Sequence, residues 1–198
     1  MTYNAAKAMR RLIHIPIIHT SADLGSLSES VRTRYLEEFG PLVWVQRERA
    51  VENLWQAIRA KINRLEVPYH AVRLYQDGLP VCGFEQQIVE QLARAGSCNH
   101  QLLLELIGKG ATLMGTEDPQ LLMQEYQMQQ QAAANQPPAD QGGAQQAARA
   151  KNLLEARDRF IAQRIAATLG AGETGLLFLG AAHRLEMSEF PDIALETQ

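Results

Sequence analysis

The sequence has few of the features that mark secreted, membrane-spanning or polyanion-binding proteins. Its two cysteines, Cys82 and Cys98, have neither CxxC spacing nor the disulfide framework that small secreted folds need. No apolar run approaches the roughly 20 residues that cross a bilayer. Acidic residues outnumber basic ones by 22 to 19, so no broad cationic surface is available for nucleic acid. We therefore expect a cytoplasmic protein that has neither a membrane nor nucleic acid as its partner.

Short apolar runs at regular intervals predict the strands of one sheet. They occupy residues 12–18, 41–45, 70–75, 111–114 and 176–179. Pro16 cannot donate a hydrogen bond to a neighbouring strand, so the first strand should have a free edge or a bulge. The last run is apolar throughout, which is typical of a central parallel strand.

The segments between these runs have the apolar spacing of helices. The predicted helices cover residues 28–39, 50–65, 84–95, 99–107, 119–130 and 147–169. This alternation predicts an α/β fold, with a mostly parallel central sheet of about five strands and helices on both faces. We expect one domain over residues 1–198, with a flexible insertion at 132–146 that is rich in Gln, Ala, Pro and Gly.

Polar side chains follow four of the predicted strands. His19 follows the first strand, Gln46 and Glu48 follow the second, Glu117 follows the fourth, and His183 follows the last. In an open parallel sheet the reactive crevice lies outside the carboxyl ends of the strands, so these side chains should converge at one edge. Imidazole and carboxylate groups together suit a divalent ion such as zinc or manganese. The predicted ligands are His19, His183 and Glu117.

Two other chemical interpretations have less support. The chain has no HExxH pair that would mark a local zinc site. The string Gly170-x-Gly172-x-x-Gly175 matches a dinucleotide fingerprint, but it follows a helix and opens a strand, which is the reverse of the required order. These glycines are better explained as a helix end and a turn.

The polar residues at the strand ends carry a family resemblance. Gly180-Ala-Ala-His183 is similar to the late Gly-x-x-His motif of the TraB and Tiki superfamily, which includes GumN-like, ChaN-like and erythromycin-esterase-like proteins. Pro16-Ile-Ile-His19 resembles the early Gly-x-x-His motif with proline in place of glycine, and the family glutamate aligns with Gln46 or Glu48. Arg157 lies on a helix that resembles the one carrying the family arginine. The resemblance implies a metal-dependent peptidase or other hydrolase.

The leading hypothesis is a hydrolase acting on a small molecule or a peptide. In it His19, His183 and either Glu48 or Glu117 bind a divalent metal ion or share acid–base work, while Arg157 stabilises developing negative charge. The alternative is a non-catalytic protein that binds a partner through the helices beside residues 132–146. An apolar helix stripe left uncovered would indicate a homo-oligomer, although core packing explains such a stripe equally well.

The same residues also have purely structural interpretations. Glu117 could assist Asp118 at the start of the following helix, where a carboxylate is favoured by the helix dipole. Arg157 could form a surface ion pair with its charged neighbours, and Glu48 lies between two arginines in a segment typical of a solvated loop. The distance between His19 and His183 in the fold distinguishes these interpretations from a reaction centre.

Overall fold

The protein is built on one parallel sheet. The computed structural model describes residues 9–20, 23, 28–134 and 143–197. Five strands lie in the order β3-β2-β4-β1-β5, and every neighbouring pair is parallel. Their bounds are β1 Arg10–Ile17, β2 Val72–Gln76, β3 Thr112–Met114, β4 Thr174–Gly180 and β5 Ile193–Thr197. The predicted α/β class is confirmed.

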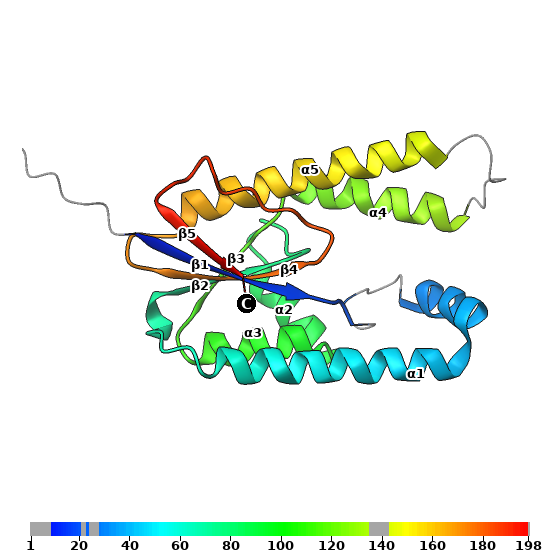
Figure 1. Cartoon of the computed structure of the whole chain (residues 1–198), viewed down its shortest axis with the longest axis horizontal. Helices are drawn as coiled ribbons and strands as arrows, with labels where there is room; N and C mark the ends of the chain where they lie inside the picture. The colour runs from blue at the N-terminus through cyan, green and yellow to red at the C-terminus, as the bar shows by residue number, and fades with distance from the viewer. Residues whose placement is uncertain (1–8, 21–22, 24–27, 135–142, 198) are drawn as a thin grey trace, which may run out of the picture.

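Helices cover both faces of this sheet (Figure 1). Helices α1 (Ser28–Ile62), α2 (Glu85–Arg94) and α3 (Cys98–Gly108) lie on one face, and α4 (Pro119–Ala134) and α5 (Gly143–Thr168) lie on the other. The α4–α5 pair and the first part of α1 extend past the carboxyl ends of the strands. None of the described helices is long and apolar enough to cross a membrane.

Alternating side chains of the strands fill two separate cores. Leu176 and Phe178 point to the core shared with α1, α2 and α3, whereas Leu177 and Leu179 point to the core shared with α5. All four side chains are fully buried. Such burial on both faces explains why this strand is apolar throughout.

Pro16 lies where β1 has no neighbour on one side. Strand β5 pairs with Arg10 to His14 only, so the last residues of β1 are unpaired on that side. The Arg10 amide donates to Asp192 on the β5 side, and the Arg11 amide donates to Glu173 on the β4 side. Backbone amides of even-numbered residues in β1 therefore point towards β5, so the amide proton that Pro16 lacks would point to the unpaired side. The predicted free edge is therefore present, and the proline weakens no pairing.

The predicted strand at 41–45 is wrong. These residues belong to α1, which kinks at Gly40 (φ 80°) and continues through Pro41. Proline is tolerated there because the first turn of a helix needs no backbone donor. Of the apolar run only Trp44 is buried, and Leu42, Val43 and Val45 remain exposed.

The fifth strand of the sheet is β5, which the sequence pattern did not predict. It lies at the sheet edge, and of its residues only Ile193 is buried. Arg11 of β1 donates to both carboxylate oxygens of Glu196 on β5, at 2.9 and 2.8 Å. The strand is thus fixed by a partner far away in the chain.

The predicted insertion at 132–146 has helical ends. Helix α4 continues to Ala134 and helix α5 begins at Gly143, while residues 135–142 lie outside the described part of the chain. At the other end of α4, Asp118 accepts hydrogen bonds from the amides of Gln120 and Leu121, as its predicted capping role requires.

Candidate active site

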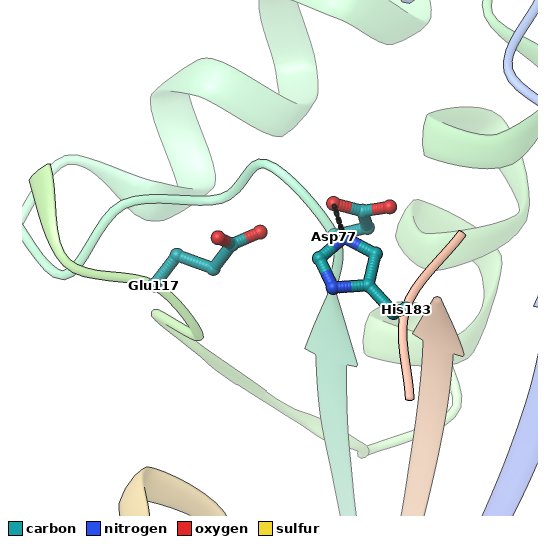
Figure 2. Close-up of side chains that lie close together, drawn as sticks. All are labelled: Asp77, Glu117 and His183. Carbon is teal, nitrogen blue, oxygen red and sulfur yellow. Dashed lines mark ion pairs between the residues drawn. The ribbon is translucent and has the colours of Figure 1, made fainter. Parts of the chain in front are cut away.

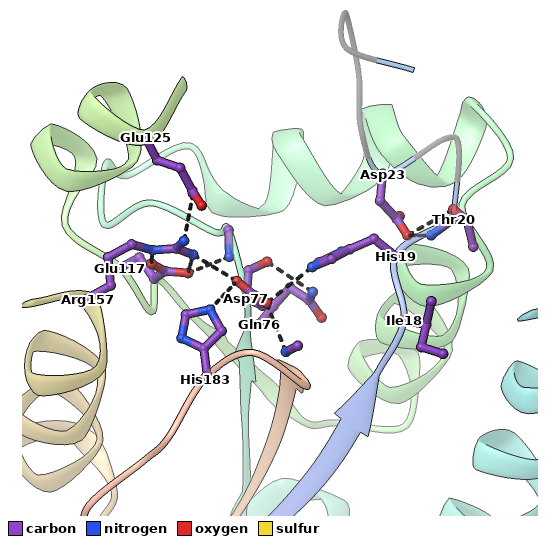
Figure 3. Close-up of polar contacts among 12 residues, drawn as sticks. Ile18, His19, Thr20, Asp23, Gln76, Asp77, Glu117, Glu125, Arg157 and His183 are labelled. Carbon is purple, nitrogen blue, oxygen red and sulfur yellow. Dashed lines mark hydrogen bonds and ion pairs between the residues drawn. The ribbon is translucent and has the colours of Figure 1, made fainter. Parts of the chain in front are cut away.

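Four polar side chains meet at the carboxyl edge of the sheet (Figure 3). His19 follows β1, Asp77 follows β2, Glu117 follows β3, and His183 follows β4. Both histidines contact Asp77: Nε2 of His19 lies 3.2 Å from Oδ2, and Nε2 of His183 lies 3.4 Å from Oδ1. The prediction that the two histidine-bearing loops meet at one edge is confirmed.

Asp77 is the centre of the cluster. Its Oδ2 accepts a hydrogen bond of 2.9 Å from the Gly180 amide, and its Oδ1 accepts one of 3.0 Å from Arg157. Burial alone would raise the pKa of Asp77, but hydrogen bonds from His183 and His19 outweigh it and hold this pKa well below its ordinary range. Asp77 is therefore a charged carboxylate at neutral pH.

Gly180 makes room for this carboxylate. A Cβ atom at position 180 would lie 2.7 Å from Oδ2 of Asp77, which is closer than real Cβ contacts allow. The glycine of the Gly-x-x-His sequence is thus required by the close approach of the β2 and β4 ends. It also supplies the amide that holds Asp77.

Arg157 binds the carboxylates from helix α5. Its Nε lies 2.5 Å from Oε2 of Glu117, its Nη2 lies 2.8 Å from Oε1, and its Nη1 lies 2.6 Å from Glu125. The Gly78 amide also donates to Glu117, at 2.6 Å. Burial raises the pKa of Glu117 even though Arg157 acts in the opposite direction. The guanidinium is buried and engaged with carboxylates, so it neutralises their charge.

His183 is oriented by a carboxylate behind it. Its Nδ1 lies 2.6 Å from Oδ1 of Asp158, and the other oxygen of Asp158 accepts from the Arg184 amide at 3.0 Å. In the protonated ring both nitrogens carry a proton, so Nδ1 faces Asp158 and Nε2 faces Asp77 as donors. When the ring loses one proton, the Asp158 contact keeps the remaining proton on Nδ1. Burial would lower the pKa of His183, but the hydrogen bonds to Asp158 and Asp77 raise it to about 9.

Replacement of Asp158 by asparagine should lower the pKa of His183. The variant keeps an acceptor but removes a negative charge, so we expect a fall of about 1–3 units, measured by NMR titration of the ring. In the native protein the raised pKa stabilises the fold fully below the ordinary value of 6.5, and this contribution is lost as pH rises through about 9. Glu186→Gln, which changes an exposed residue after His183, is the control. An unchanged His183 pKa in Asp158→Asn would contradict this description.

Three of these side chains have the geometry of a metal-binding group (Figure 2). Asp77, Glu117 and His183 each offer one ligand atom, and these atoms lie within 4.8 Å of one another. Two carboxylates and an imidazole suit zinc or manganese. The Asp158 contact behind His183 is the support that metal-ligating histidines usually have. These residues therefore offer three donor atoms of the kind that a divalent ion binds.

The other predicted site residues lie in different places. His19 contacts the opposite oxygen of Asp77 and is outside the three-residue group. Its side chain is 37% exposed, whereas that of Asp77 is 5% exposed. Glu48 and Gln46 lie on the exposed surface of α1, because the strand expected to precede them is part of that helix. They do not join the cluster.

Sequence reasoning missed Asp77 and Asp158. Asp77 directly follows a predicted strand, but it opens the sequence Asp77-Gly78-Leu-Pro80, whose composition is typical of a turn. The strand-end argument applied to the histidines would have found it. Asp158 lies among charged residues of a helix, and its burial and its contacts with His183 and the Arg184 amide distinguish it from a surface residue.

Comparisons of the chain with family models, with curated proteins and with solved structures find no match.

Proposed function

We propose that the protein is a metal-dependent hydrolase whose reaction centre is the cluster at the carboxyl edge of the sheet. The observation that carries this proposal is the orientation of His183. Asp158 holds Nδ1, and Nε2 is aimed at the two carboxylates that complete a three-ligand group. The three ligand atoms come from the ends of three different strands, and a convergent group of titratable side chains with shifted pKa values is a candidate functional site.

Each residue has a distinct role in this proposal. Asp77, Glu117 and His183 would hold the ion, which when bound lowers the pKa of a water molecule so that the water can act as a nucleophile. His19 is the exposed member of the cluster, and a hydrogen bond to Asp77 raises its pKa. It is therefore suited to exchange a proton with the substrate. Arg157 keeps the buried carboxylates ionised and in position.

We also propose that the chain is related to the TraB and Tiki superfamily and that its substrate is an ester or a peptide. Its support is the order of the motif residues along the chain together with the meeting of His19 and His183 at Asp77. Gly180 of the late motif has a physical function here, since it admits the Asp77 carboxylate.

Replacement of His19 by glutamine should separate catalysis from metal binding. If His19 transfers protons, His19→Gln should lower kcat for an activated ester or a peptide by about 10²–10⁴-fold. Metal affinity, measured by calorimetry, should change little because His19 is not among the three ligands. The control is His70→Ala, an exposed histidine before β2. Equal turnover in His19→Gln and the native protein would remove His19 from the mechanism.

A second candidate function is partner binding without catalysis. Phe39, Leu42, Val43 and Val45 are exposed apolar side chains around the kink of α1. Such a group on a protein surface is typical of an interaction site. It lies on a different element from the cluster, so this candidate does not depend on a reaction centre at the sheet edge.

A further inference from the structure

The segment that carries His19 is held at both sides of that residue. The indole Nε1 of Trp55, on α1, donates to the Ile18 carbonyl at 3.3 Å. On the other side, the amide and the hydroxyl of Thr20 donate to Oδ2 of Asp23, at 2.6 and 2.9 Å (Figure 3). The chain is therefore held on both sides of His19.

Asp23 is itself fixed to the start of helix α3. Its Oδ1 accepts a hydrogen bond from the Ser97 hydroxyl and lies 3.2 Å from Nδ1 of His100. Ser97 is the N-cap of α3 and accepts from the His100 amide at 3.2 Å. The carboxylate is 2% exposed and lies where a helix dipole favours negative charge. The chain after β1 is thus attached to an element that is distant in sequence.

The group formed by Asp23, Ser97 and His100 does not have the geometry of a Ser-His-Asp reaction centre. Ser97 Oγ lies 2.7 Å from Nδ1 of His100, and Asp23 contacts the same nitrogen. In a catalytic triad the serine and the carboxylate bind opposite ring nitrogens. Ser97 is also fully buried, so no substrate reaches its hydroxyl. The contacts of Asp23 are those of an anchor.

We propose that Asp23 is a positioning residue that holds His19 against Asp77 through Thr20, Ser97 and His100. The inference deepens the proposed function and rests on it, because it explains how the exposed proton-transfer group keeps its place. The charge state of Asp23 supports this role. Burial opposes its ionisation, but hydrogen bonds from His100, Ser97 and Thr20 outweigh burial and lower the pKa of Asp23.

The test is the position of the His19 ring in solution. Nε2 of His19 lies 3.6 Å from the point where a Cβ of Gly180 would be, so ring protons beside Nε2 should give a nuclear Overhauser effect to a Gly180 Hα proton. Asp23→Asn should abolish this signal at a fixed pH while the core resonances remain native. Glu173→Gln is the matched control, since Glu173 also accepts from a backbone amide and pairs with an arginine, at the opposite edge of the sheet.

A second variant keeps the test decisive if Asp23→Asn does not fold. Ser97→Ala retains the carboxylate and its contact with His100 but removes the hydrogen bond from the Ser97 hydroxyl, and should reduce the His19–Gly180 signal at least about twofold. A native signal in a folded Asp23 or Ser97 variant would overturn the proposal. The measurement needs neither metal nor substrate. If the variants lose the His19–Gly180 signal but the native protein binds no metal, the positioning role of Asp23 holds and the proposed metal-dependent function fails. If the native protein binds metal but the variants keep the signal, only the positioning role fails.

Discussion

Replacement of Arg157 by methionine is expected to reduce the free energy of unfolding by about 3–5 kcal/mol, measured by urea denaturation near neutral pH. The guanidinium donates to Glu117 twice and to Asp77 and Glu125 once each. Glu117 is 1% exposed, so water cannot replace the lost partner. Removing one member of a buried ion pair leaves the full desolvation cost of the other, whereas methionine conserves much of the apolar volume of arginine.

Two comparisons isolate this electrostatic cause. Arg159→Met changes an exposed arginine on the same helix and should alter stability by no more than about 0.5 kcal/mol. The cost of Arg157→Met should also shrink as pH falls, because Glu117, whose pKa is already raised, can take up a proton and become neutral. A cost below about 1 kcal/mol at neutral pH, or one that does not change with pH, would contradict this account of the cluster.

Metal affinity is expected to rise about tenfold for each unit of pH up to a pH of about 9. His183 carries an extra proton below that pH, and a metal ion at Nε2 must displace it. Asp77 contributes no such dependence, because its pKa is held well below the ordinary range. Calorimetric titration with Mn²⁺ between about pH 6 and about pH 8 should therefore show about a hundredfold change in affinity.

The Asp158→Asn variant is the control for this dependence. With a lower His183 pKa, the rise in affinity should level off at a lower pH than in the native protein. Titration in two buffers of different ionisation enthalpy should also reveal the release of a proton. Metal binding without proton release at neutral pH would mean that the ion does not displace the His183 proton.

Much of the fold was predictable from residue patterns. Strands β1, β2 and β4 are short, with an apolar run in β1 and β4 and an alternating pattern at the start of β2, and the helices between them show clear apolar spacing. Their layers therefore follow from local sequence. The run at 41–45 misled the prediction because five apolar residues fit a strand and a helix equally well. Strand β5 was missed because an edge strand is only half buried and depends on the distant Arg11–Glu196 contact.

The site was predictable only in part. Strand direction brings His19, Glu117 and His183 to one edge, and this follows from topology alone. The role of Asp158 depends on side-chain contacts that no sequence spacing encodes. The strand-end argument places Asp77 at the same edge, but it does not identify Asp77 as the residue that both histidines contact. Asp77 joins both histidines, and Asp158 reaches His183 from a helix 25 residues earlier in the chain.

The most direct test of the central claim is a calorimetric titration of chelator-treated protein with Mn²⁺ or Zn²⁺, comparing the native chain with His183→Ala and with His70→Ala. One ion should bind per chain in the native protein and in His70→Ala, and affinity should fall by at least about a hundredfold in His183→Ala. Native protein that binds neither ion, or His183→Ala that binds with native affinity, would contradict a metal centre at the carboxyl edge of the sheet.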